Sequence, residues 1–275
     1  MRRLRVGAVR DLNAKPLYHG LDALGEIDLL MDVPSRLAER LRRGDLDVAL
    51  IPSIEYLRGA HLGYRIVPGF AIAARGPVWS VRLFCRRPLS RIHSLALDDA
   101  SRTSQALTRI LLAKRHGVRP ERIETLPIGV PMQECLADAI LLIGDKAIGV
   151  DERPFVRVID LAQDWKEWTG LPFVFAVWTA RAGVELGNLP ELLESCRASA
   201  LANPEALVAA HGVGLGLDHD QCLEYLTSVL SYDLDPPAIE GMRRFARLAA
   251  ELDLAPQGVD LVFHHPSDLV GHPRG

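Results

Sequence analysis

The chain has 275 residues, with 32 Lys and Arg against 35 Asp and Glu, and 48% of its residues are hydrophobic. This composition is typical of a folded globular protein, and the length suits about two domains or lobes. The net charge of -3 provides no basic field for nucleic acid, and no apolar run reaches the roughly 18 residues of a membrane span. The four cysteines form no CxxC pair, which favours free thiols in a reducing compartment and a cytoplasmic location.

The first two thirds of the chain alternate between strand and helix patterns. Arg5 to Val9 predicts a strand, Val33 to Arg43 a helix, and Asp47 to Ile51 a buried strand. Ser101 to His116 predicts a further helix that ends at Gly117. Other strands are predicted at Ser80 to Phe84, Leu95 to Leu97, Ile123 to Ile128, Ala139 to Ile143, Val156 to Leu161 and Phe173 to Trp178.

The last third of the chain has helical spacing and no convincing strand. Helices are predicted at Leu189 to Ala202, Pro204 to His211, Asp218 to Ser231 and Pro236 to Glu251. The segment from Asp260 onward predicts a tail. Its histidines, His264, His265 and His272, have no acidic or Cys partner at ligand spacing, so we expect no metal site.

This order of elements predicts an α/β fold with mostly parallel sheets, divided into two lobes around a central cleft. We expect the chain to cross between the lobes near Cys85 to Ile92 and again near Trp168 to Val177. The first lobe would then hold residues 1–88 and 176–275, including the C-terminal helices, and the second lobe would hold residues 89–175.

Polar residues that follow the predicted strands are candidates for a ligand site, because ligands of parallel α/β sheets lie beyond the carboxyl ends of the strands. These candidates are Asn13, Ser53, the segment Ser101 to Ser104, and the pair Gly144 and Asp145. Ser101-Arg102-Thr103-Ser104 opens a helix, whose free N–H groups and positive dipole end suit a carboxylate or phosphate. Taken alone, the segment is better explained as a simple helix cap with its other hydroxyls facing water.

Two further segments each have two possible structural interpretations. Gly76-Pro77 predicts a turn that presents Trp79 or Ser80 near a cleft, or an ordinary loop. Three of the four tryptophans lie between Trp165 and Trp178, where they would wall a ring-shaped ligand or pack the lobes, and packing is favoured for most of them. Motifs for nucleotides, serine hydrolases and zinc proteases are absent.

Six segments in order carry a family resemblance. They are Val6 to Val9 running into Leu12 to Leu17, Asp47 to Tyr56, Gly76 to Val81, Asp98 to Leu107, Leu142 to Ala147, and Trp168 to Trp178. Together they resemble the menaquinone-biosynthesis family of the futalosine pathway and, within it, the chorismate dehydratases. The resemblance covers roughly the first 180 residues.

The resemblance implies a type II periplasmic-binding-protein-like fold used for an intracellular lyase. The implied reaction removes water from chorismate and gives 3-[(1-carboxyvinyl)oxy]benzoate, with no cofactor. The chorismate molecule would be the small-molecule partner, and a homodimer through the C-terminal helices is also possible.

Within this reading we assign the site residues as follows. Asn13 and Asp145 are the catalytic candidates, and the substrate-binding candidates are Ser53, Ser80, Ser101, Arg102, Thr103, Ser104 and Gly144. The helix start would bind one carboxylate, while Ser53, Ser80 and Asn13 would bind the hydroxyl group and the second carboxylate. No histidine lies in the matching segments, so the base is either a carboxylate of the substrate or Asp145.

One residue departs from the family pattern. Relatives usually carry an aromatic residue just before Leu12-Asn13, where this chain has Asp11. A carboxylate facing the cleft would repel a dianionic ligand, so we expect Asp11 to point outward or the ligand contacts near Asn13 to differ.

Two other functions remain open. The family's sibling that makes 1,4-dihydroxy-6-naphthoate shares the fold, but it is expected to offer a cleft histidine that this chain lacks. A non-enzymatic binding protein for small carboxylates is the second alternative, because the fold is commonest in that role.

Overall fold

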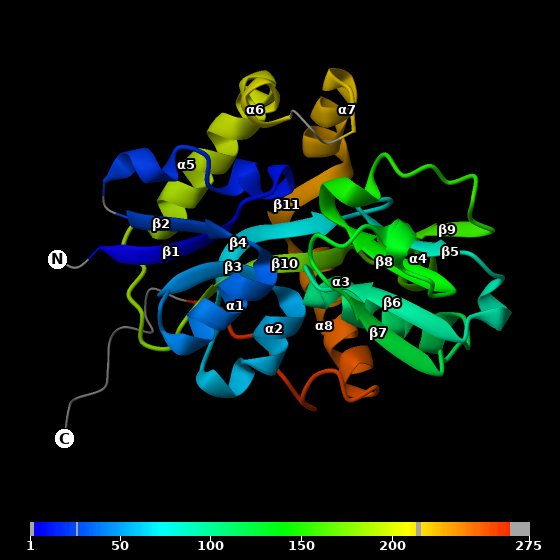
Figure 1. Cartoon of the computed structure of the whole chain (residues 1–275). Helices are drawn as coiled ribbons and strands as arrows, with labels where there is room; N and C mark the ends of the chain where they lie inside the picture. The colour runs from blue at the N-terminus through cyan, green and yellow to red at the C-terminus, as the bar shows by residue number, and fades with distance from the viewer. Residues whose placement is uncertain (1–2, 26, 213–215, 265–275) are drawn as a thin grey trace.

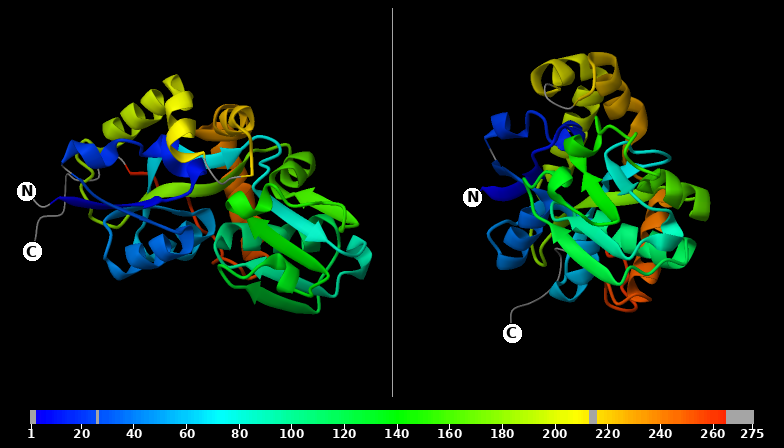
Figure 2. Two further views of the ribbon diagram at one scale, coloured as in Figure 1. Left: turned by 45° about the horizontal axis from the view of Figure 1, so that its top comes forward. Right: turned by 45° about the vertical axis from the view of Figure 1, so that its right-hand side comes forward.

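The computed structural model describes residues 3–25, 27–212 and 216–264. Its strands form two separate β-sheets, each flanked by helices, and these make two lobes side by side (Figure 1). The two lobes are also distinct in the left view of Figure 2. No helix within these ranges is both long enough and apolar enough to cross a bilayer.

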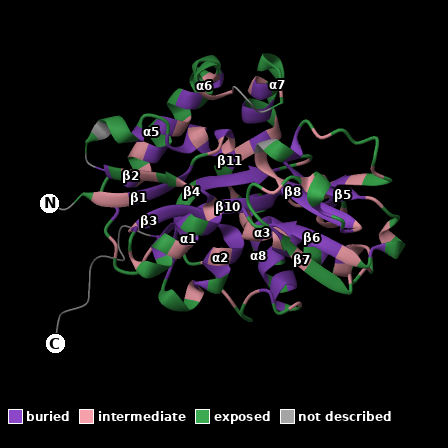
Figure 3. Cartoon of the chain, viewed as in Figure 1, coloured by how far each residue is buried: buried purple, intermediate pink, exposed green. Residues whose placement is uncertain are grey.

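The first lobe contains a six-stranded sheet in the order β11-β4-β10-β3-β1-β2. Its strands are β1 (Leu4–Val9), β2 (Ile27–Asp32), β3 (Val48–Pro52), β4 (Arg65–Ala74), β10 (Phe173–Ala180) and β11 (Leu230–Leu234). Every residue of β3 and β10 is buried, as expected for apolar runs covered on both faces (Figure 3). These two central strands therefore form the middle of the core.

The second lobe contains a five-stranded sheet in the order β7-β6-β8-β5-β9. Its strands are β5 (Val81–Cys85), β6 (Ser94–Asp98), β7 (Arg122–Leu126), β8 (Ala139–Ile143) and β9 (Arg157–Asp160). Strand β8 lies at the centre, between β6 and β5, and its run Ala-Ile-Leu-Leu is buried. The end of β8, which Gly144 follows, points toward the first lobe (Figure 1).

The α-helices pack on the faces of the two sheets. They are α1 (Pro34–Arg43), α2 (Ser53–Arg58), α3 (Arg102–Ile110), α4 (Leu161–Thr169), α5 (Leu189–Ala202), α6 (Pro204–His211), α7 (His219–Glu224) and α8 (Pro236–Ala250). Helices α3 and α4 lie against strands of the second sheet. In Figure 1, α5, α6 and α7 lie above the first sheet, and α1 and α2 lie below it. A π-helical turn extends α3 through residues 111–115, so the long predicted helix is present.

The prediction of mostly parallel sheets is wrong in detail. Among the described strands, four neighbouring pairs are parallel and five are antiparallel. In the first sheet, β10 brings the chain back from the second lobe between β3 and β4, and it runs opposite to both of them. A strand that returns between two outgoing strands has to be antiparallel to them.

The first crossing comes several residues before its predicted position, and the second falls within the predicted range of Trp168 to Val177. Strand β5, expected in the first lobe, pairs with β8 and β9 in the second sheet, and β10 enters the first sheet at Phe173. The first crossing is fixed at its second-lobe end by Asp160, which caps α4. Its Oδ2 atom accepts the backbone N–H groups of Val78 at 2.8 Å and Trp79 at 2.7 Å. This anchor turns the chain into the second sheet before β5 begins.

The C-terminal third is helical except for one strand, β11, whose first residues have the spacing of a helix and were predicted as one. Helices α5 and α6 have the predicted bounds, but the predicted helix from Asp218 to Ser231 gives way to β11 at Leu230. Strand β11 alternates buried and more exposed residues, and it pairs with β4 at the edge of the sheet. Strands β2 and β4 were not predicted either. The predicted tail residues His265 and His272 lie outside the described residues.

Helix α8 packs tightly on the start of β10. The rings of Trp165, Phe173 and Phe245 form edge-to-face contacts there, and the indole N–H of Trp165 donates to the carbonyl of Pro172 at 3.2 Å. Gly241 of α8 faces the same carbonyl, and a Cβ atom on this residue would lie 2.2 Å from the oxygen. The close approach of helix and strand therefore requires glycine at residue 241.

We predict that Gly241→Ala destabilises the protein by about 1–3 kcal/mol, although alanine favours a helix, because the new methyl group meets backbone. Chemical denaturation measures the free energy of unfolding. Gly76→Ala is the matched control, since its Cβ would only touch the end of the Gln163 side chain at 3.6 Å. Equal stability of the two variants would contradict the packing argument.

Candidate active site

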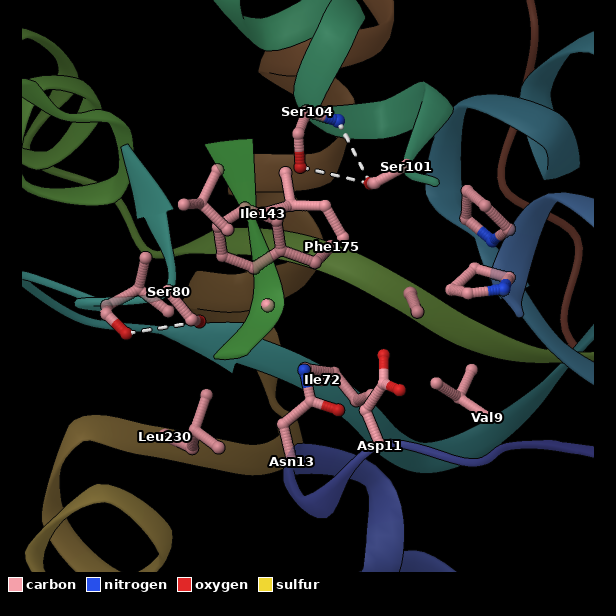
Figure 4. Close-up of a pocket in the computed structure, with 16 residues that line it drawn as sticks. Val9, Asp11, Asn13, Ile72, Ser80, Ser101, Ser104, Ile143, Phe175 and Leu230 are labelled. Carbon is pink, nitrogen blue, oxygen red and sulfur yellow. Dashed lines mark hydrogen bonds between the residues drawn. The ribbon is translucent and has the colours of Figure 1, made fainter. Parts of the chain in front are cut away.

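A cavity lies where the two sheets face each other, with about 570 Å³ of atom-free space that includes its opening to solvent. Both lobes contribute to its walls, and the residues are drawn in Figure 4. The lining residues are Val9, Asp11, Asn13, Pro34, Pro52, Ile72, Val78, Ser80, Val81, Ser101, Ser104, Ile143, Gly144, Phe175, Ala176 and Leu230. Most of this surface is apolar, with a few polar groups at separate points, which is typical of a small-molecule site.

Asn13 is a polar group that the first lobe offers to the cavity. Strand β1 ends at Val9 and the chain turns into the short 3-10 helix Leu12–Leu17, which carries Asn13. The Tyr18 hydroxyl fixes this turn by donating to the carbonyl of Val9 at 2.8 Å. The Asn13 Oδ1 atom is buried and has no hydrogen-bond partner among the described residues. A buried acceptor without a partner is costly, so a bound ligand would gain by supplying one.

The start of α3 is the polar group that the second lobe offers. Ser101 is the N-cap, and its Oγ atom accepts the backbone N–H of Ser104 at 3.4 Å and lies 3.0 Å from the Ser104 hydroxyl. The first N–H groups of a helix have no partner within it, and the helix dipole makes this end positive. Figure 4 shows the serine pair on the opposite side of the cavity from Asn13. The arrangement suits an elongated anion.

Ser80 and Gly144 line a third side of the cavity and are tied together. The backbone N–H of Gly144 donates to the Ser80 carbonyl at 2.7 Å. The Ser80 hydroxyl accepts a hydrogen bond from the Tyr225 hydroxyl at 2.8 Å and donates one to the carbonyl of Val78 at 3.3 Å. Because these contacts hold its oxygen in place, Ser80 presents a fixed polar edge. Sequence reasoning missed Tyr225, which comes from the helical C-terminal third.

Ser53, Arg102 and Thr103 do not line the cavity, although they were expected to bind substrate. The buried Ser53 hydroxyl donates to the carbonyl of Val174 at 2.8 Å. The Thr103 Oγ1 atom accepts the backbone N–H of Ile54 at 3.2 Å, and Arg102 pairs with Glu55 at 3.0 Å. The Ser53 Oγ atom also lies 3.4 Å from Thr103 Oγ1, so the three residues hold α3 of the second lobe against α2 of the first, and Ser53 ties α2 to β10.

Asp145 follows β8 in a short 3-10 helix, Gly144–Ala147, and its side chain lies outside the described part of the structure. Its catalytic role therefore stays a prediction. The neighbouring Lys146 pairs with the buried Asp98 at 2.6 Å. Asp98 also accepts the backbone N–H of Ile143 at 3.1 Å, which fixes the end of β8. The position of Gly144 at the cavity depends on this contact.

The expectation that Asp11 points outward is wrong. Asp11 lines the cavity, and Figure 4 shows its carboxyl group beside the amide of Asn13. Packing was rightly favoured for the tryptophans, since Trp165 and Trp178 are fully buried in the core. Phe175 is the aromatic residue that forms a wall, and no local signal distinguished it from its neighbours.

No group of three or more His, Cys, Asp or Glu side chains suited to a metal ion exists among the described residues. The cavity lining that the structure describes contains no histidine and no cysteine either. What this site can do chemically is to hold a small anion between a helix N-terminus and an amide, with one carboxyl group beside it.

We predict that Thr103→Val destabilises the protein by about 1–3 kcal/mol, because the buried N–H of Ile54 loses its acceptor. Arg102→Ala should cost less than about 1 kcal/mol, since the side chain of Arg102 is 37% exposed. Denaturant unfolding of the two variants gives this comparison. A Thr103→Val protein as stable as the wild type would show that Thr103 does not anchor the helix.

Comparisons with known proteins agree with this architecture. The family model described as menaquinone biosynthesis matches residues 4–251. The chorismate dehydratase of Thermus thermophilus is 34% identical over 274 residues, which cover 93% of this chain and 98% of the relative. The chorismate dehydratase of Campylobacter jejuni is 26% identical over 244 residues, which cover 89% of this chain and 92% of the relative.

Among solved structures, the periplasmic aliphatic sulphonate binding protein of Escherichia coli superposes with a TM-score of 0.65 at 16% identity. The match covers 100% of this chain and 96% of the other. This likeness confirms the predicted periplasmic-binding-protein-like fold and, at such low identity, nothing beyond the fold. The family model and the Thermus relative carry the assignment further: the chain belongs to the menaquinone-biosynthesis family.

Proposed function

We propose that this protein is a chorismate dehydratase, a carbon-oxygen lyase that converts chorismate into 3-[(1-carboxyvinyl)oxy]benzoate and water. The observation that carries the proposal is that the α3 N-terminus and Asn13, whose amide oxygen has no partner among the described residues, line the same cavity. Two chorismate dehydratases that resemble the chain along most of its length support the choice of substrate.

The reaction produces an aromatic ring, and this aromatisation supplies the driving force, so the protein needs only to assist the proton transfer and the loss of the hydroxyl group. A proton leaves the ring carbon that bears the enol ether, and the hydroxyl group leaves the neighbouring carbon. A site that orients the substrate and excludes water lowers the barrier without further chemistry. The apolar walls formed by Ile72, Phe175 and Leu230 suit the ring.

The polar groups of the cavity match the charges of chorismate. The α3 N-terminus, with the hydroxyls of Ser101 and Ser104, would bind one carboxylate. Asn13 and Ser80 would bind the hydroxyl group and the second carboxylate. The proton is removed by a carboxylate of the substrate itself or by Asp145. The protein contributes no cofactor in this scheme, and the buried thiols of Cys85, Cys135 and Cys196 fit a cytoplasmic location.

The direct test is to incubate the purified protein with chorismate, without added cofactor, and to follow substrate and product by chromatography and mass. We expect chorismate to be consumed and the enolpyruvyl benzoate to appear above the rate without enzyme. Bound but unreacted chorismate would instead indicate a binding protein. The absence of both binding and turnover would reject chorismate as the ligand.

We predict that Asn13→Ala lowers kcat/KM for chorismate by about 100-fold or more, because the hydrogen bonds of one oriented group are lost. The free energy of unfolding should not fall, since Asn13 Oδ1 has no partner in the unliganded protein. Steady-state kinetics and denaturant unfolding measure the two quantities. Asn203→Ala, at an exposed residue between α5 and α6, is the control and should match the wild type. Unchanged kinetics in Asn13→Ala would remove Asn13 from the site.

A further inference from the structure

Asp11 supplies an ionisable side chain that the proposed reaction has not yet used. Of the described residues that line the cavity, Asp11 is the one with a titratable side chain. It begins the 3-10 helix Leu12–Leu17, yet its side chain makes no capping hydrogen bond. The helix is capped instead by the backbone, where the Asp11 carbonyl accepts the N–H of Ala14 at 3.1 Å. The carboxyl group is therefore available to a ligand.

The surroundings of Asp11 make its ionised form less favourable than it is in water. Burial raises the pKa of Asp11, and the positive charges of Arg10, Lys15 and Lys146 oppose this effect. Lys146 is itself paired with Asp98 at 2.6 Å, which weakens its lowering effect on the pKa of Asp11. The nearby Tyr18 hydroxyl donates to the carbonyl of Val9, and burial, Asp11 and Asp22 raise the pKa of Tyr18, so this side chain stays uncharged. Within the described residues, Asp11 forms no ion pair.

A dianionic ligand in the cavity makes the ionised form less favourable still. Chorismate carries two carboxylates, and a third negative charge on Asp11 would repel them at short range in a mostly apolar space. The complex is therefore favoured when Asp11 carries a proton. Substrate binding and proton uptake by Asp11 are then linked, and a neutral acid is placed beside Asn13 in the occupied site.

We propose that Asp11 is a catalytic acid of this site, which gives its proton to the hydroxyl group that leaves chorismate. The inference rests on the proposed dehydratase function. The base takes the proton from the carbon that bears the enol ether, and the C–H electron pair forms the new ring double bond. The C–O bond of the neighbouring hydroxyl breaks, and its oxygen takes the bonding pair and the Asp11 proton to leave as water. Asp11 then recovers a proton from the protonated base.

The variant Asp11→Asn tests this role, because asparagine has nearly the same shape but cannot give up a proton in this way. We expect kcat for chorismate to fall by about 100-fold to 10,000-fold, while binding of the product is retained. Asp22→Asn is the matched control, since Asp22 is exposed and does not line the cavity. Turnover by Asp11→Asn within about threefold of the wild type overturns the proposal and leaves the dehydratase function intact. A wild-type protein that does not convert chorismate overturns both.

Proton uptake gives a second readout in the wild-type protein. The probe is 3-[(1-carboxyvinyl)oxy]benzoate, which also carries two carboxylates and does not react further. Its affinity should fall about tenfold for each pH unit above the pKa of Asp11, and calorimetry in buffers of different ionisation heat should count up to one proton bound. Both effects should disappear in Asp11→Asn. Product binding to the wild type with no proton uptake between pH 5 and pH 9 would overturn the proposal.

A third readout needs no ligand. A carboxyl group whose pKa is raised in the folded state destabilises the fold once it ionises, so the loss is absent below its ordinary pKa of 3.8 and grows as the pH rises. Asp11→Asn should therefore be more stable than the wild type at pH 7, and the difference should shrink toward pH 4. Denaturant unfolding at several pH values measures this, and a difference that is constant with pH would contradict the proposal.

Discussion

The hydroxyl group of Thr103 fixes the geometry on which the site depends. It accepts the backbone N–H of Ile54 at 3.2 Å and thereby attaches the first turn of α3, in the second lobe, to the start of α2, in the first. Ser53 adds a hydrogen bond to β10, and Arg102 adds an ion pair to Glu55. The contacts of Thr103 with Ile54 and of Arg102 with Glu55 therefore link the two lobes, and Ser53 fixes α2 on β10 within the first lobe.

With α3 held in this way, the polar ends of two elements face the same cavity. Ser101 and Ser104 lie at the start of α3, and Asn13 and Asp11 lie after β1 on the other side. Each element leaves groups that its own lobe does not satisfy: the first N–H groups of the helix, and the buried oxygen of Asn13. A ligand that spans the cavity satisfies both, which explains how a fold shared with binding proteins supports catalysis.

Much of this arrangement follows from local sequence patterns, and the rest depends on packing. Asn13, Ser80, Ser101, Ser104 and Gly144 line the cavity, as expected for residues beside strand ends and helix starts. The inward direction of Asp11 could not be predicted, because the side chain's orientation depends on the turn that Tyr18 holds. The first two residues of β11, Leu230 and Ser231, were read as the end of a helix, because the strand is recognised by its pairing with β4, and so Leu230 was missed. Tyr225 was missed because its hydrogen bond to Ser80 joins residues far apart in the sequence.

The most direct test of the central claim is a crystal structure with 3-[(1-carboxyvinyl)oxy]benzoate bound. The account predicts one carboxylate within hydrogen-bond distance of the Ser101 and Ser104 hydroxyls and the first N–H groups of α3. The other end of the ligand should lie against Asn13 and the carboxyl group of Asp11. A ligand bound elsewhere, or one that contacts neither the Asn13 side chain nor the start of α3, would contradict the account.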